Sequence, residues 1–213
     1  MQFCLPKFIL YSIDYSAAST ICLKSKVSEY KINVIEQLFK VYDIPYQKKA
    51  IAEETEEYTN LVEKCGIDQF PMLQVDNHFL PSFQAICRHL ATRFGLHCES
   101  LIDETYSDII AEMLFTLISI IERGSEFSSV KNQDDAMYEA TNFVNTKMGP
   151  YLIHYIGKIR NIELTHREYL FKKNAIWLDY ALQWIILLIN DYFGKTQLFL
   201  TCSVKTFADI NVK

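Results

Sequence analysis

The sequence predicts an α/β unit over residues 1–96 followed by an all-helical unit over residues 97–213. In the first unit short apolar runs alternate with amphipathic helical patterns, whereas long helical patterns alone fill the second. The chain has 213 residues, of which 50% are hydrophobic and 22% charged, so it is long and apolar enough to bury such cores.

The first unit is expected to follow the element order β-α-β-α-β-β-α. The predicted strands cover residues 8–13, 46–52, 72–75 and 78–80, and the predicted helices start at an Asn33 cap, at residue 53 and at Ser82. Gly66 and Gly95 stand where C-cap glycines close the second and third helices. The last two strands form a hairpin, which makes the sheet mixed. This is the order of the thioredoxin fold.

The second unit is expected to consist of long helices over residues 102–123, 134–147 and 168–193, with a further stretch over 151–162 beyond Gly149–Pro150. Their apolar residues recur every three to four positions, as on the buried face of a helix. No apolar stretch reaches the roughly 20 residues that a membrane span needs, so no membrane association is expected. We therefore expect a soluble, cytoplasmic protein.

Composition excludes several classes of function. The net charge of −5 and the pI near 5.6 give no basic surface for nucleic acid. Six cysteines and five histidines show neither a CxxC pair nor metal-ligand spacing, so neither a zinc site nor a redox pair is expected. Scattered free cysteines fit a reducing compartment.

One gap-free pattern is specific. It comprises Gln69-Phe70-Pro71-Met72-Leu73-Gln74-Val75-Asp76, Leu80-Pro81, Ala85-Ile86-Cys87-Arg88-His89-Leu90-Ala91 and Phe94-Gly95-Leu96. It resembles glutathione transferases, and most closely their sigma class, which includes the glutathione-dependent prostaglandin D synthases. Thr206-Phe207-Ala208-Asp209 is similar to the T-x-A-D box that starts a core helix of that family's second domain. The resemblance implies a thioredoxin-like domain plus an all-α domain, the latter truncated at its C-terminus.

The resemblance implies a cytoplasmic homodimer that conjugates glutathione, its co-substrate, to small hydrophobic electrophiles, in detoxification or in isomerisation. A tyrosine hydroxyl near the end of the first strand would bond to the glutathione sulfur. That bond lowers a thiol pKa of about 8.5 and creates a nucleophile. Tyr11 matches this tyrosine best, and Tyr15 and Tyr30 compete with it.

The same resemblance implies the binding residues. Gln69, Phe70 and a cis Pro71 form the turn whose Phe70 backbone pairs with the cysteinyl part of glutathione. Tyr58 stands where sigma members have a Trp at the glycyl end, and Asp108 matches an Asp that reaches the partner subunit's glutathione amine. The alternatives are ordinary ones: a hairpin-entry proline, a surface tyrosine and a surface aspartate.

Several positions depart from the family pattern. Ser82-Phe83 replaces a Gln-Ser pair that grips the γ-glutamyl carboxylate. We expect Ser82 to cap the third helix and Phe83 to block the pocket. Val62 replaces a lysine, and Glu29 lies closest to a missing arginine. Each lost charge-assisted hydrogen bond is worth about 1.5–3 kcal/mol.

Two other readings stay open. One is a non-catalytic protein on the same fold, as are the lens crystallins related to sigma transferases. The other is a thiol-disulfide oxidoreductase, for which Cys22 is the candidate cysteine before the first helix. Residues 14–30 and 169–193 resemble insertions relative to the family. The electrophile is not readable from the sequence.

Overall fold

The computed structural model describes residues 6–16, 23–125, 130–152, 154 and 176–193. The chain divides into two compact units, Met1–Gly95 and Leu96–Lys213, next to the boundary that the sequence predicts at residue 96. Three predicted features lie wholly or mostly outside the described residues: Cys22, the Thr206–Asp209 box and the helical stretch over 151–162.

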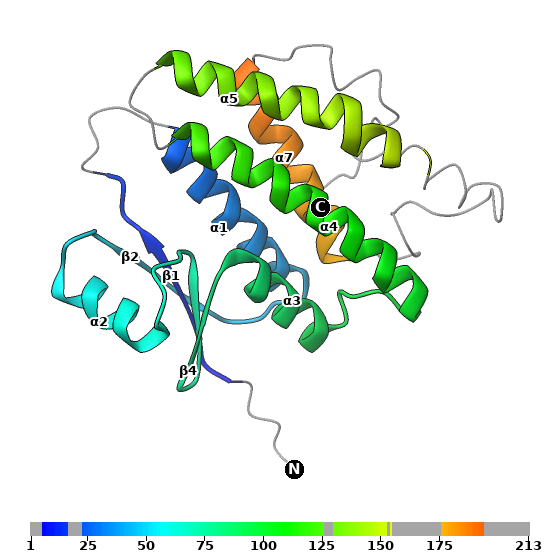
Figure 1. Ribbon diagram of the computed structural model, residues 1–213. Helices are drawn as coiled ribbons and strands as arrows, with labels where there is room; N and C mark the ends of the chain where they lie inside the picture. Colours follow the sequence, from blue (N-terminus) through cyan, green and yellow to red (C-terminus); the bar gives the residue numbers. More distant parts are fainter. Residues whose placement is uncertain (1–5, 17–22, 126–129, 153, 155–175, 194–213) are drawn as a thin grey trace. The chain divides into compact units, whose positions relative to one another are not determined.

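A four-stranded mixed sheet with the order β2-β1-β3-β4 forms the centre of the first unit (Figure 1). Its strands are β1 (Phe8–Ile13), β2 (Gln47–Ile51), β3 (Met72–Val75) and β4 (His78–Pro81). β1 pairs in parallel with β2 and antiparallel with β3, and β3 and β4 form the predicted hairpin. The thioredoxin-like order of strands and helices is therefore confirmed.

The two faces of the sheet are covered by different helices: α1 (Leu23–Val41), α2 (Glu56–Cys65) and α3 (Phe83–Phe94). Phe8 projects from β1 toward α1 and α3, with its ring 5.3 Å from that of Phe39 and 6.0 Å from that of Phe94. Tyr11 projects from the opposite face and packs in one cluster with Leu61 of α2. Because side chains alternate along a strand, the face of every β1 residue follows from these two.

The first helix begins eleven residues earlier than the sequence predicts, since α1 starts at Leu23 and Asn33 lies inside it. The prediction of a cap at Asn33 is therefore wrong. Val27, Tyr30 and Val34 are all buried and are spaced by three and four residues. They extend the apolar stripe of the later turns toward the N-terminus, so residues 23–30 belong to the helix.

The ends of α2 and α3 follow the capping rules at three of four positions. The Thr55 hydroxyl accepts the Tyr58 backbone N–H at 3.2 Å and starts α2. Gly66 at φ 72° and Gly95 at φ 71° close the two helices in the left-handed conformation, as predicted. The fourth position, Ser82, behaves differently and is described with the site.

All the regular secondary structure in the described part of the second unit is helical. It contains α4 (Leu101–Ser125), α5 (Val130–Phe143), the π-helical turn η1 (Val144–Met148) and α7 (Trp177–Phe193). α4 and α5 lie side by side (Figure 1). The π turn precedes Pro150, which has no N–H for an α-helical bond, and Gly149 instead donates to the Val144 carbonyl.

A buried carboxylate starts α7. The Asp179 side chain is 2% exposed, and its Oδ2 accepts the Ile176 backbone N–H at 2.8 Å. This is the N3 half of a capping box, formed although Ile176 offers no hydroxyl for the other half. Within the described ranges, no helix combines the length and apolarity needed to cross a membrane.

Candidate functional site

Most of the predicted binding residues of the first unit meet at the C-terminal end of β1. Tyr11 pairs with Met72, and Met72 pairs with Pro81, at the last rung of the β1–β3–β4 ladder. Phe70 precedes that rung by two residues and Ser82 follows it, so both lie just past the same end of the sheet. The Phe70–Pro71 peptide bond is cis, as expected.

Tyr58 joins this group from α2. Its ring stacks on that of Phe70, with 5.6 Å between centroids and 9° between planes. Its hydroxyl donates to Asp68 Oδ2 at 2.6 Å. This hydrogen bond raises the pKa of Tyr58 to about 12, with further contributions from burial and from the charges of Asp68 and Glu53. Gln69, between Asp68 and Phe70, is exposed.

The sequence analysis missed Asp68. Its partner Tyr58 lies ten positions earlier in the chain, and the two meet because Gly66 ends α2 and reverses the chain. The only available signal was the C-cap glycine between an aromatic residue and a carboxylate, which is too common a pattern to indicate a contact.

Although Tyr11 lies on the last rung of the ladder, its hydroxyl does not lie at this end of the sheet. Tyr11 is 5% exposed, and its hydroxyl donates to Gln74 Oε1 at 2.8 Å. Gln74 pairs with Ile9, so the phenol is directed along the sheet toward the start of β1 and away from Phe70 and Ser82. Burial, with a smaller effect of the Glu57 charge, raises the pKa of Tyr11.

Tyr30 is also remote from solvent. It lies on α1, is 2% exposed, and its ring centroid is 5.7 Å from that of Phe83. Burial raises the pKa of Tyr30 well above its ordinary value. A fully buried phenol of this kind packs the helices and cannot meet a ligand in the sheet-end group.

Tyr15 is the competing tyrosine that lies beyond the C-terminal end of β1. Asp14 fixes the chain there, because its N–H donates to the Ile51 carbonyl at 2.8 Å and its Oδ1 accepts the Ser16 N–H at 2.8 Å. Tyr15 is half-buried, and the Lys24 ammonium lies 5.8 Å from its ring centroid. The charge of an ionised Tyr15 also contributes to the raised pKa of Tyr58, so the two phenols share one electrostatic environment.

Ser82 does not cap α3, which contradicts the sequence prediction. It lies at φ 79° and ψ 123°, and its hydroxyl makes no capping bond. Capping needs the extended, negative-φ backbone that Thr55 adopts at φ −89° and ψ 159°. A non-glycine residue in the region of Ser82 stores about 1–3 kcal/mol of strain, and such strain is concentrated at functional sites.

Phe83 is a core residue. It is 4% exposed, and its ring packs against Tyr30 between α1 and α3. The ring is thus part of the helix packing and does not project over the sheet end, as a blocking residue would.

The remaining predicted positions are dispersed. Val62 of α2 packs against the cluster around Tyr11, and Glu29 is exposed on α1. Asp108 is half-buried on α4 of the second unit. Among the described residues, no group of three or more His, Cys, Asp or Glu side chains could hold a metal ion.

Comparison with known proteins gives a consistent fold. No family model matches the chain. The chain is 28% identical over 89 residues to S-crystallin 2 of Enteroctopus dofleini, covering 41% of this chain and 40% of that protein. It is 31% identical over 78 residues to glutathione S-transferase 4 of Caenorhabditis elegans, covering 37% of each. The chain thus spans less than half the length of these curated relatives.

The solved structures match over nearly the whole chain. NaGST-2 has a TM-score of 0.71 at 16% identity, over 96% of this chain and 90% of that one. The Nu-class glutathione transferase of Haemonchus contortus has a TM-score of 0.65 at 17% identity, also over 96% and 90%. The chain therefore has the glutathione transferase fold, a thioredoxin-like unit followed by a helical one, as predicted.

Proposed function

We propose that the chain belongs to the glutathione transferase family and binds glutathione at the C-terminal end of β1. The observation that carries this proposal is the convergence of Tyr58, Gln69, Phe70, Pro71 and Ser82 at that end of a sheet with this fold. The reaction would be conjugation of the glutathione thiol to a small hydrophobic electrophile, or a glutathione-dependent isomerisation.

Backbone groups supply most of the proposed docking. The Phe70 main chain pairs with the cysteinyl residue in the manner of an added strand. The N–H groups at the start of α3 attract the γ-glutamyl carboxylate, because a helix N-terminus carries partial positive charge. These contacts do not require the side chain at residue 83, so they are compatible with a buried Phe83.

Tyr15 is the tyrosine that we assign to the thiol, in preference to Tyr11. The Tyr11 hydroxyl is bonded to Gln74 and directed toward the other end of the sheet. Tyr15 follows β1 at the correct end, beside Lys24 and in the electrostatic environment of Tyr58. A phenol that donates to a thiolate stabilises the anion and lowers the thiol pKa.

Calorimetric titration of the full chain with glutathione tests the proposal. We expect binding in the micromolar to millimolar range, and a substantially weaker complex for Tyr58→Ala, which removes the ring beside Phe70. Tyr138→Ala is the matched control, since Tyr138 is 76% exposed on α5. Absence of heat and of retention on immobilised glutathione would refute the proposal.

A second candidate, a non-catalytic protein on the same fold, is favoured by one observation. The tyrosine that best matches the family pattern, Tyr11, is buried and already hydrogen-bonded. One curated relative is an S-crystallin, which fits this reading. The two candidates separate in an assay with a reactive aryl halide: binding with turnover supports the transferase, and binding without turnover supports the scaffold.

A homodimer of the sigma type, in which Asp108 reaches the partner subunit's ligand, is the expectation we carry over from the resemblance. A similar solved structure is described as monomeric Na-GST-3 of Necator americanus, so dimerisation does not follow from the fold. Native mass spectrometry of the full chain tests it, and a monomer at micromolar concentration would exclude a shared site.

A further inference from the structure

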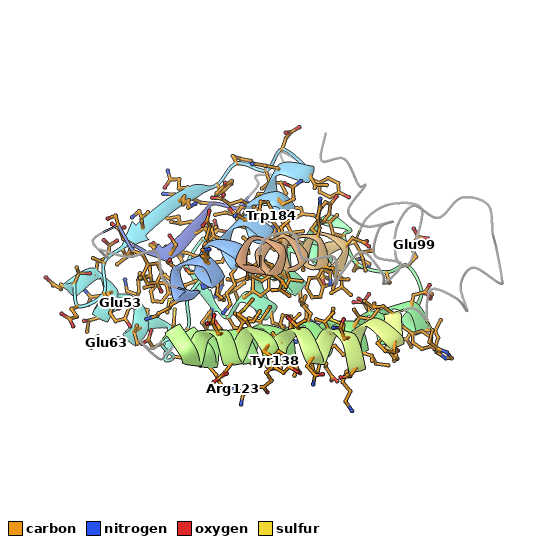
Figure 2. All side chains as sticks on the ribbon, turned by 90° about the horizontal axis from the view of Figure 1, so that it is seen from above. Glu53, Glu63, Glu99, Arg123, Tyr138 and Trp184 are labelled. Carbon is orange, nitrogen blue, oxygen red and sulfur yellow. The ribbon has the colours of Figure 1, made fainter. Side chains whose placement is uncertain are left out.

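The α2 region concentrates negative charge beside the proposed site. Residues 53–68 contain one ammonium, on Lys64, and six exposed carboxylates: Glu53, Glu54, Glu56, Glu57, Glu63 and Asp68. Figure 2 shows Glu53 and Glu63 in the same part of the first unit. Such a grouping is by itself an ordinary solvated surface, so its meaning depends on what it faces.

Two of these carboxylates act directly on the docking residues. Asp68 Oδ2 lies 2.6 Å from the Tyr58 hydroxyl, and the Tyr58 ring stacks on Phe70. The charges of Asp68 and Glu53 both help to raise the pKa of Tyr58. A ligand held against the Tyr58–Phe70 pair therefore lies in a negative potential.

The neighbouring cations are already engaged. Lys24 Nζ lies 3.1 Å from Glu53 Oε1, and Lys49 Nζ lies 3.9 Å from Glu57 Oε1. Lys64 is placed over the Phe79 ring, 5.8 Å from its centroid. Among the described residues, Asp68 forms no ion pair, and its charge is offset by the Tyr58 hydroxyl alone.

Glutathione brings one net negative charge to this place. At neutral pH its γ-glutamyl end carries a carboxylate and an ammonium, which cancel, whereas its glycyl end carries an unbalanced carboxylate. We infer that the preferred ligand is a glutathione-like thiol whose glycyl carboxylate is neutralised as an amide. The resemblance puts the glycyl end at Tyr58, and the Asp68 carboxylate bonded to Tyr58 repels a free carboxylate there. This inference rests on the proposed function and refines its substrate class.

The direct test compares two ligands of equal shape, glutathione and its glycyl amide, by calorimetry on the full chain at low ionic strength. We expect the amide to bind about three- to tenfold more tightly, the range for one like-charge contact in a partly solvated site. High salt should reduce the ratio, since exposed charges are screened.

Asp68→Asn should bring the ratio toward unity, because the asparagine oxygen still accepts the Tyr58 hydroxyl while the charge is lost. Asp43→Asn is the matched control: it removes the same charge at an exposed turn after α1, where φ is 50° and asparagine is tolerated. The control should keep the ratio of the parent chain.

The outcomes separate the inference from the proposal on which it rests. Equal binding of the two ligands, or tighter binding of glutathione, overturns the charge preference and leaves the transferase proposal standing. A preference for the amide that persists in Asp68→Asn also overturns it, since the carboxylate would then not be the cause. Failure of both ligands to bind overturns the proposed function and the inference together.

Discussion

Replacing Phe83 with serine should destabilise the first unit and should not create a better glutathione site. Phe83 is 4% exposed, and its ring packs 5.7 Å from that of Tyr30 between α1 and α3. Truncating a buried phenylalanine costs about 3–5 kcal/mol, and a buried hydroxyl without a partner adds to that cost. A domain has only about 5–15 kcal/mol to lose.

Urea titration followed by circular dichroism measures this effect. With a slope of about 1–3 kcal/mol per molar urea, the midpoint of Phe83→Ser should fall by more than about 1 M. Phe83→Leu, which keeps most of the volume, should lose less than about 1.5 kcal/mol. Tyr42→Ser is the control, because Tyr42 is 49% exposed at the end of α1. If Phe83→Ser keeps the midpoint of the parent and gains affinity for glutathione, the ring fills a ligand pocket and the packing argument fails.

Three further predictions concern groups with defined partners. The pKa of Tyr58 is raised to about 12, so the folded state loses stability as pH rises from about 10 to 12. In a plot of the urea midpoint against pH, Tyr58→Phe should reduce the slope over this range. An unchanged slope would contradict the prediction. Asp179→Ala removes the acceptor of the Ile176 N–H and should cost about 1–3 kcal/mol in thermal unfolding, so a melting temperature equal to that of the parent excludes a capping role. Gly95→Ala should reduce the free energy of unfolding by about 1–2 kcal/mol because of φ 71° alone, since no atom lies within 4 Å of the added Cβ. Gly95→Asn should reduce it less. A larger loss for asparagine than for alanine would be inconsistent with a backbone origin.

The fold was predictable because its signals are local. The apolar run of Phe8–Ile13 matches β1 at both ends, and Gly66 and Gly95 end the helices that they were expected to end. The start of α1 was missed because Asn33 satisfies the capping rule at a position where the chain is already helical. A capping residue is a weak signal when the buried stripe continues on its N-terminal side.

The site was harder to predict because it depends on the direction in which each side chain points and on contacts between residues distant in the sequence. A pattern match at the end of β1 identifies Tyr11 as a residue of the right cluster, but it does not show that the Tyr11 hydroxyl is bonded to Gln74, toward the start of β1. The contacts of Tyr58 with Asp68 and of Phe83 with Tyr30 join residues that are 10 and 53 positions apart. Sequence spacing carries no information about such contacts.

In the proposed function, docking and activation of the thiol depend on different groups. Docking would rest on the backbone at the end of the sheet and at the start of α3, which depends little on the surrounding side chains. Activation would rest on the local potential, and the negative charge of Asp68 beside the Tyr58 hydroxyl disfavours a second anion nearby. Of the two features that favour the anion, Tyr15 and Lys24, the lysine is already paired with Glu53 at 3.1 Å. Under the proposed function, such a chain would keep glutathione binding while its turnover falls, and this balance would be the physical difference between the transferase and the non-catalytic candidate.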